Sequence, residues 1–240
     1  MNRMASFFGI GVGPGDSELL TVKAVNTIKQ LDVLYTPQAH KGGKSVAEKI
    51  AAPYLPANLE IKRRHFPMVK DWEIKMKSWQ EIAAEIGHDV ENGNNVGFLT
   101  LGDPAVYSTF SYIAEMLKGQ INVQTIAGIS SFSQIAASLS VPLMLDEETL
   151  EVIPATADIA QLEKAIDVND NVIIMKIATR FDQIYKILEE RDLLEKTVIV
   201  ENASRKTQKE KKLVDYSIGD KLPYFSTALL KKRQKNVKSN

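Results

Sequence analysis

Apolar residues along the chain form two kinds of pattern, short continuous runs and longer segments with helical spacing. The clearest helical segment covers residues 72–90. Its apolar positions recur at alternating steps of four and three, as on one face of a helix: Trp72, Met76, Trp79, Ala83, Ile86 and Val90. Two tryptophans on one stripe indicate the core or a subunit interface rather than a cofactor site.

The first half of the chain alternates the two patterns. We expect strands at residues 6–12, 32–35, 60–64 and 96–101, the second stopped by Pro37. Helical spacing predicts helices at residues 17–31, 46–54, 72–90 and 108–117. Strands that alternate with helices are typical of a parallel sheet.

The second half restarts near Ile121. Strands are expected at residues 123–126, 150–153, 171–175, 197–201, 213–217 and 223–230, with helices at 132–139, 159–166 and 180–191. The chain therefore predicts two α/β domains of similar size, residues 1–119 and 120–230. A polar, basic tail follows at 231–240, and its composition predicts disorder.

Composition narrows the class of protein. The chain has 240 residues, with Lys+Arg and Asp+Glu at 30 each, so its net charge of zero argues against nucleic-acid binding. The absence of cysteine excludes disulfides, thiolate metal sites and a cysteine nucleophile. The N-terminus lacks the shape of a signal peptide, and no run approaches the roughly 20 apolar residues of a membrane span. We expect a cytoplasmic protein.

A strand, a tight turn and a helix start meet at residues 98–111, FLTLGDPAVYSTFS. Gly102 has no Cβ, so a ligand can approach the backbone there. Asp103 brings a carboxylate to the carboxyl end of the strand, where open α/β sheets bind ligands. Pro104 fixes φ and ends the strand. The alternative is an ordinary turn in which Asp103 caps the helix.

The first glycine-rich loop, GIGVGPGD at residues 9–16, imitates a dinucleotide-binding fingerprint. A glycine pattern alone is a weak signal. Pro14 stands where the helix would begin, and Thr36 and Pro37 occupy the place of the acidic residue that would bind the ribose. The pattern therefore argues against a nicotinamide cofactor. It is compatible with a tight turn at the end of the first strand.

Four blocks in order resemble the tetrapyrrole methylase family: GPGD at 13–16, FPMVKDW at 66–72, LGDPAVYSTFSY at 101–112 and GISSF at 128–132. The resemblance extends to about Thr227 and is strongest to the branch that methylates carbon 20 of precorrin-2 or cobalt-factor II. It implies two α/β domains with the active site in the cleft between them, S-adenosylmethionine as methyl donor, and a place in cobalamin biosynthesis. Most relatives carry Pro where this chain has Ala127.

The resemblance also implies a set of cofactor-binding residues: Pro14, Leu101, Gly102, Asp103, Val106, Ser130, Ser131, Met175, Ala203, Thr227 and Ala228. Several have a plain structural alternative. Ser130 and Ser131 are also good N-cap residues, and Met175 ends an apolar strand and suits the core.

The substrate end is predicted from charge. A corrin precursor carries many carboxylates, and Arg63 and Arg64 stand directly before the FPMVKDW block. An arginine fork suits carboxylates, so we expect both to bind substrate together with Tyr107 and Ser108. The alternative is a solvated basic strand edge. His40, His65 and His88 lack ligand-like spacing, so any cobalt should belong to the substrate.

Methyl transfer to an electron-rich carbon depends mainly on the alignment of the reacting groups. The sequence identifies no general base. Thr36 stands where the uroporphyrinogen branch typically has Asp. Two alternatives stay open: a methylase of the same fold that acts on another corrin carbon, and a non-catalytic nucleotide-binding protein. The family is generally dimeric, so we expect a homodimer, with no nucleic acid and no membrane as partner.

Overall fold

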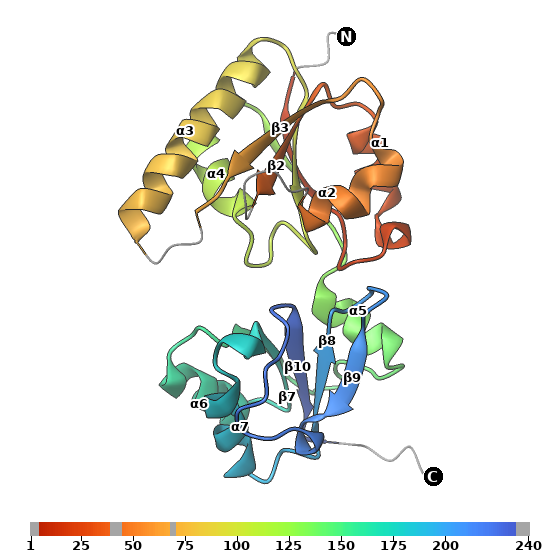
Figure 1. The fold of residues 1–240 in the computed structure, drawn as a ribbon, viewed down its shortest axis with the longest axis vertical. Coiled ribbons are helices and arrows are strands. Elements are labelled where there is room, and N and C mark those ends of the chain that lie inside the picture. The colour runs from red at the N-terminus through yellow and green to blue at the C-terminus, as the bar shows by residue number, and fades with distance from the viewer. Residues whose placement is uncertain (1–4, 39–44, 68–70, 234–240) are drawn as a thin grey trace. The chain divides into compact units, whose positions relative to one another are not determined.

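The computed structural model of the protein describes residues 5–38, 45–67 and 71–233. Its backbone divides into two compact units, Met1–Ser130 (unit 1) and Ser131–Asn240 (unit 2). Each unit is built on one five-stranded sheet with helices packed against it (Figure 1). The expected class of two α/β domains is therefore confirmed.

Unit 1 holds a sheet whose strands are all parallel, in the order β3-β2-β4-β1-β5. The strands are β1 (Phe7–Gly11), β2 (Val33–Gln38), β3 (Glu60–His65), β4 (Val96–Thr100) and β5 (Val123–Ile126). The helices are α1 (Val22–Ile28), α2 (Val46–Ala51), α3 (Trp72–Glu91) and α4 (Phe110–Leu117). Because all strands run the same way, their carboxyl ends share one edge of the sheet.

Helices cover both faces of this sheet. Phe8 and Ile10 of β1 pack with α1 and α2, whereas Phe7 of the same strand packs with α3 and α4. The central strands β1 and β4 are buried at every position. Burial on both faces explains why these strands read as continuous apolar runs rather than as alternating patterns.

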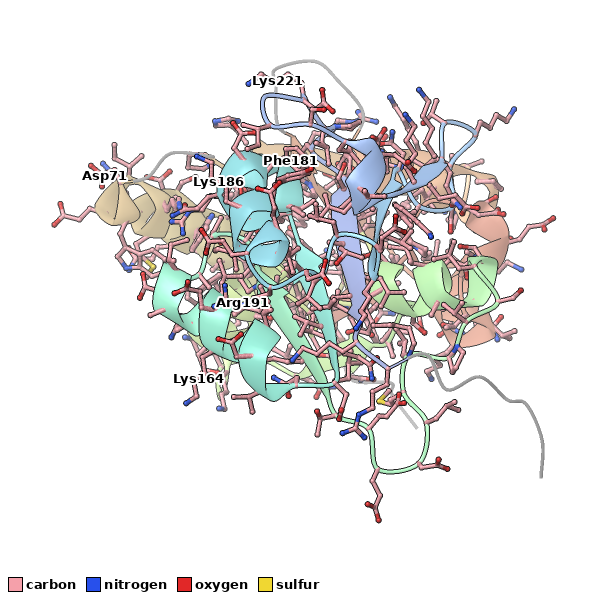
Figure 2. The ribbon with its side chains drawn as sticks, turned by 90° about the horizontal axis from the view of Figure 1, so that it is seen from below. Asp71, Lys164, Phe181, Lys186, Arg191 and Lys221 are labelled. Carbon is pink, nitrogen blue, oxygen red and sulfur yellow. The ribbon has the colours of Figure 1, made fainter. Side chains whose placement is uncertain are left out.

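Unit 2 has a mixed sheet in the order β6-β7-β10-β8-β9. Only β6 and β7 pair in parallel. The strands are β6 (Leu150–Pro154), β7 (Asn171–Met175), β8 (Thr197–Glu201), β9 (Lys209–Lys212) and β10 (Ser226–Lys231), and the helices are α5 (Ser131–Ser138), α6 (Ile159–Val168) and α7 (Phe181–Glu189). Helices α6 and α7 pack on one face, and α5 packs on the other. Arg191, labelled in Figure 2, lies just beyond α7 and bonds Asp167 of α6 at 2.7 Å.

The division between the units falls later than the expected boundary at residue 119. Strand β5 was expected to open the second domain, but it pairs with β1 in register, with Phe7 opposite Val123 and Ile10 opposite Ile126. This backbone pairing keeps β5 in unit 1. The sequence pattern alone does not reveal the pairing. The chain crosses to unit 2 only at α5.

Two elements of unit 1 differ in extent from the predictions. The helix expected at 17–31 is a 3₁₀ turn followed by α1, because Asp16 caps the turn and Thr21 caps α1 through the amide of Ala24 at 3.1 Å. Strand β2 continues through Pro37 instead of stopping there. Its pairing with β4 ends at Tyr35, so Pro37 borders only β3, and its missing N–H interrupts no second ladder.

Two predictions near the C-terminus are wrong. Residues 213–217 do not form a strand: Leu213–Asp215 is a 3₁₀ turn, and the strand is the preceding KEKK segment, β9. The expected tail also begins too early. Lys231 is the last residue of β10, and its Nζ donates to the carbonyl oxygen of Leu143 at 3.2 Å. Residues 234–240 of that tail lie outside the described residues.

None of the helices within the described ranges combines the length and the apolar composition that crossing a membrane would require.

Candidate functional site

Three loops meet at the carboxyl edge of the unit 1 sheet. They follow the adjacent strands β4, β1 and β5. The first two are joined by reciprocal backbone bonds, in which the amide of Gly102 donates to the Gly13 oxygen at 2.8 Å and the amide of Gly13 donates to the Gly102 oxygen at 3.3 Å. The GPGD loop and the GDP turn, widely separated in sequence, are therefore one backbone assembly.

Glycine is required where these loops touch. A Cβ on Gly11 would lie 2.6 Å from the Cα of Gly128, and one on Gly128 would lie 2.8 Å from the Cα of Gly11 and closer still to the Gly102 oxygen. Gly13 and Gly102 also have φ values of +74° and +73°, a region that favours glycine. The three loops therefore pack backbone against backbone, with no side chain between them.

Asp103 ties this assembly together. Its Oδ1 accepts the amide hydrogen of Ala105 at 2.7 Å, and its Oδ2 accepts that of Gly128 at 3.0 Å. It does not cap α4, which begins at Phe110, where the Oγ of Ser108 accepts the amide hydrogen instead. The carboxylate thus holds the turn and the third loop in place, while its oxygens keep further lone pairs for a ligand.

We predict that Asp103→Asn lowers the free energy of unfolding by about 1 to 2 kcal/mol, because an amide can replace only one of the two acceptor oxygens. Urea denaturation measures the change. Asp16→Asn is the matched control, because Asp16 accepts one bond, from the amide of Glu18, in an exposed turn, and asparagine keeps it. Equal stability of the two variants would contradict the structural role of Asp103.

The other unit 1 candidates differ in exposure. Pro14 is buried beside the glycine contact, and Leu101 packs on the side of α1 and α2. Val106 closes the GDP turn through a bond from its amide to the Asp103 oxygen at 3.1 Å. Ser130, two residues beyond Gly128, is partly exposed.

Tyr107 and Ser108, both expected at the substrate, point to different environments. Tyr107 is exposed and has a φ of +48°, which is unusual for a bulky residue. Ser108 is buried, and its hydroxyl shares a hydrogen bond with that of Thr100 at 3.1 Å. The Ser108 hydroxyl is therefore used within the unit.

The basic residues of β3 are paired with acids of the flanking helices. Lys62 bonds Asp89 of α3 at 2.8 and 2.9 Å, and Arg64 bonds Glu85 of the same helix at 2.7 Å. Arg63 points to the other face and bonds Glu48 of α2 through its Nε at 3.1 Å. The alternation of a strand separates the two arginines that were expected to act together.

These pairs are partly buried. The side chain of Glu48 is 2% exposed and also accepts the hydroxyl of Thr36 at 3.2 Å, and its hydrogen bond raises the pKa of Arg63. Burial, with a bond to Asp89 at 2.7 Å, raises the pKa of the Tyr35 hydroxyl. The Arg64–Glu85 pair stays 35% and 46% exposed, so the alternative of a solvated basic edge and a substrate role for Arg63 and Arg64 both stay predictions.

The unit 2 candidates gather at one edge of its sheet. Thr227 at the start of β10 lies opposite Met175 at the end of β7 and opposite Val200 of β8. Met175 and Ala203 pack in the cluster beneath α5, whose first residue is Ser131. The side chain of Ala228 lies on the opposite face, fully buried with α6 and α7. A side-chain contact from Ala228 to a ligand at the α5 face is thereby excluded.

Sequence reasoning missed two residues next to Ala203. The Oγ of Ser204 and one terminal nitrogen of Arg205 are buried without a hydrogen-bond partner among the described residues. Their only signal in the sequence is their position directly after a predicted cofactor residue.

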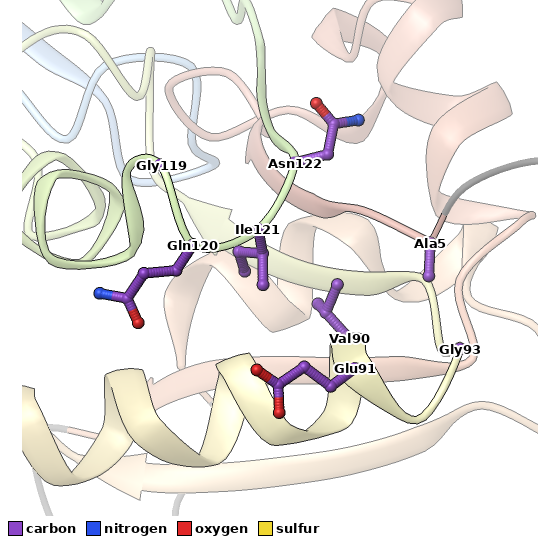
Figure 3. Close-up of a pocket in the computed structure, with 8 residues that line it drawn as sticks. All are labelled: Ala5, Val90, Glu91, Gly93, Gly119, Gln120, Ile121 and Asn122. Carbon is purple, nitrogen blue, oxygen red and sulfur yellow. The ribbon is translucent and has the colours of Figure 1, made fainter.

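A pocket at the opposite edge of the unit 1 sheet, of about 550 Å³, has a different character (Figure 3). It lies where β1, β4 and β5 begin, and the described residues that line it are Ala5, Val90, Glu91, Gly93, Gly119, Gln120, Ile121 and Asn122. Glu91 is the charged member of this set, so these lining residues offer an anionic ligand no cationic side chain.

The fold is that of an α/β protein in which three glycine-containing loops pack backbone against backbone at one edge of a parallel sheet. The sequence matches the family model of the tetrapyrrole (corrin/porphyrin) methylases over residues 6–214, and the chain belongs to this family. The cobalt-precorrin-2 C(20)-methyltransferase of Salmonella typhimurium is 34% identical over 94% of this chain and 96% of that protein. A probable enzyme of the same name from Methanocaldococcus jannaschii is also 34% identical, over 97% of this chain and 99% of its own length.

Solved structures share the fold at lower identity. A cobalt precorrin-4 methyltransferase superposes with a TM-score of 0.72 at 17% identity, and each chain is covered to 94%. Uroporphyrin-III C-methyltransferase from Thermus thermophilus, complexed with S-adenosyl homocysteine, gives a TM-score of 0.70 at 20% identity, over 95% of this chain and 92% of that one. The family and fold expected from the four sequence blocks are confirmed.

Proposed function

We propose that the protein transfers the methyl group of S-adenosylmethionine to carbon 20 of precorrin-2 or its cobalt-bearing counterpart, in cobalamin biosynthesis. The observation that carries the proposal is the 34% sequence identity, over nearly the full length of the chain, to the two C(20)-methyltransferases from a bacterium and an archaeon. The blocks at 66–72 and 101–112 favour this carbon over the other corrin carbons.

The proposed cofactor contacts come from both units. In unit 1 they are Pro14, Leu101, Gly102, Asp103, Val106 and Ser130, and in unit 2 they are Ser131, Met175, Ala203, Thr227 and the main chain of Ala228. The loop at Gly102 supports this assignment, because a backbone without side chains lets a ligand approach closely. The small hydroxyl groups can bond the polar groups of the cofactor.

In the proposed reaction the nucleophile is carbon 20 of the macrocycle. A carbon–carbon bond forms to the methyl group as the carbon–sulfur bond breaks, and the sulfonium leaves as a neutral thioether. Carbon 20 then loses its proton to solvent. Such a transfer depends on proximity and alignment, which is the role proposed for the rigid loops. Thr36 is fully buried and its hydroxyl is bonded to Glu48, so no base is assigned there.

Mass spectrometry of the macrocycle tests the proposal. The protein is incubated without oxygen with S-adenosylmethionine and, in separate tubes, precorrin-2 and the cobalt-bearing form. We expect the macrocycle to gain the mass of one CH2 unit, a methyl group added and a hydrogen lost, in at least one tube. Tight binding of S-adenosylhomocysteine with no methyl gained in either tube would instead favour the non-catalytic alternative or another corrin carbon.

The same two aspartate variants test the cofactor assignment. We expect Asp103→Asn to weaken S-adenosylhomocysteine binding about tenfold, because the turn that Asp103 holds carries three other proposed contacts. Asp16→Asn should bind as the wild type does. Isothermal titration measures both, and an unchanged affinity in Asp103→Asn would move the cofactor away from the GDP turn.

We also propose a homodimer, with a contact surface at Trp72 and Tyr112. Both side chains are about half exposed, and both contact Trp79, which stacks on Tyr112 at 4.8 Å. Trp72→Lys is expected to shift the protein toward monomer in light scattering, because a charge would be buried at the contact. Val22→Lys, at an exposed position of α1, is the control. A monomeric wild type, or an unchanged dimer in Trp72→Lys, would contradict this surface.

A cytoplasmic location is also proposed, and the absence of cysteine is consistent with a compartment that keeps thiols reduced.

A further inference from the structure

Two neighbouring polar groups of unit 2 lack partners. Among the described residues, three buried side-chain nitrogen or oxygen atoms have no hydrogen bond, and two of them are the Oγ of Ser204 and the Nη2 of Arg205. Buried polar groups are nearly always bonded in folded proteins, so adjacent exceptions call for a ligand or for water. The third, the Nε1 of Trp79, lies in unit 1.

The loop that carries these groups is held in one conformation. The guanidinium of Arg205 stacks on the ring of Phe225 at 4.1 Å, and its amide donates to the Asn202 oxygen at 3.1 Å. The amide of Ser204 donates to the Oε1 of Gln208 at 2.6 Å. Asn202 and Ser204 have φ values of +52° and +61°. Backbone conformations of this kind are often kept at functional sites.

Arg205 also differs from four other arginines of the described chain in its charge environment. Arg63, Arg64, Arg191 and Arg233 each lie within bonding distance of a carboxylate, and Arg180 donates from its Nη1 to the carbonyl oxygen of Ala157 at 2.7 Å. No described acid pairs with Arg205, and burial lowers the pKa of its guanidinium. Glu201, the acid nearest in sequence, bonds the hydroxyl of Tyr216 at 3.1 Å. A partly buried cation without an acid is stabilised by an anionic ligand.

The position of the loop indicates which class of ligand would bind there. Arg205 follows Ala203, and Phe225 lies just before Thr227, so the stacked pair stands where β8 ends and β10 begins. This is the sheet edge that carries the proposed cofactor contacts of unit 2. An arginine fork beside a serine hydroxyl is a donor set that fits a carboxylate.

We infer that Ser204 and Arg205 form a carboxylate-binding subsite, filled when the ligands of the proposed reaction bind. The inference rests on the proposed function for its ligands. The carboxylate belongs either to an acetate or propionate side chain of the macrocycle or to the amino acid end of the cofactor, and the two sources can be separated by binding measurements.

Arg205→Gln tests the subsite, with Lys206→Gln as the matched control, because it removes one positive charge from the adjacent exposed position. Dissociation constants are measured for sirohydrochlorin, the oxidised metal-free form of precorrin-2, for S-adenosylhomocysteine, and for its decarboxylated analogue. We expect Arg205→Gln to weaken one carboxylate ligand by about 10- to 100-fold, the loss of a charged hydrogen bond, and Lys206→Gln to change none by more than about twofold.

The pattern of losses identifies the source. Weaker sirohydrochlorin binding alone assigns the carboxylate to the macrocycle. Weaker S-adenosylhomocysteine binding, with the decarboxylated analogue unaffected, assigns it to the cofactor. Unchanged affinities for all three ligands, or equal losses for the two cofactor analogues alone, would overturn the subsite.

The experiment distinguishes a loss of folding from a loss of binding. If Arg205→Gln does not fold, as judged by circular dichroism, Arg205→Lys replaces it, and a weaker affinity is still expected because lysine lacks the fork. The readout is binding and not turnover. A wild-type protein that binds sirohydrochlorin but methylates neither precorrin-2 nor its cobalt-bearing counterpart would therefore refute the proposed reaction and leave the subsite to its own test.

Discussion

Gly128→Ala is expected to lower the free energy of unfolding by about 3 kcal/mol and to weaken S-adenosylhomocysteine binding at least tenfold. The added methyl group would meet the Gly102 oxygen and the Cα of Gly11, which are backbone atoms of two different loops. Backbone cannot rotate away as a flexible side chain can, so the three loops must separate. Separation would also break the bond from the amide of Gly128 to Asp103.

Gly87→Ala is the matched control for this prediction. Gly87 lies inside α3, where the nearest atom to an added methyl group is the Cδ2 of Leu117 at an ordinary 3.4 Å. Alanine in a helix interior is favoured over glycine by up to about 1 kcal/mol, so Gly87→Ala should be neutral or stabilising. Chemical denaturation of both variants gives the comparison. A Gly128→Ala protein as stable as wild type would refute the close packing of the loops.

Glu48→Ala is expected to lower the free energy of unfolding by about 3 to 5 kcal/mol, the range for removing one partner of a buried ion pair. The carboxylate is the acceptor for Arg63 and for the Thr36 hydroxyl. Its removal would leave a partly buried guanidinium without its counter-charge. The loss should appear as a lower urea midpoint with an unchanged slope.

Glu85→Ala tests whether the burial of an ion pair, rather than its presence alone, sets the loss of stability. Glu85 also bonds an arginine of β3, Arg64, but its side chain is 46% exposed. An exposed pair contributes about 1 kcal/mol or less, so this variant should stay close to wild type. Similar losses in the two variants would show that burial of Glu48 does not set the strength of its interaction.

Much of the fold could be predicted because the central strands of unit 1, β1 and β4, are buried at every position. Continuous apolar runs mark β1 and β4, and the stripe from Trp72 to Val90 marks α3. The sequence could not reveal β9, because its KEKK residues are all exposed and carry no apolar signal. The placement of β5 depends on pairing with β1, a contact that no local pattern encodes.

The candidate site was predictable where motifs mark it. The GPGD loop and the GDP turn could be named from sequence, but not that they bond each other or that Gly11 and Gly128 pack between them. The basic run of β3 suggested a shared pocket, whereas strand alternation and acids of two helices divide its charges. Arg205 has no motif, and only its lack of a partner distinguishes it.

The central claim is methyl transfer to carbon 20, and labelled product measures it most directly. S-adenosylmethionine with a ¹³C-labelled methyl group is supplied to the wild-type protein with precorrin-2 or the cobalt-bearing form, and the purified product is examined by NMR. The account predicts a single labelled methyl group, attached to carbon 20. A labelled methyl group on any other carbon, or an unlabelled macrocycle recovered from both tubes, would contradict it.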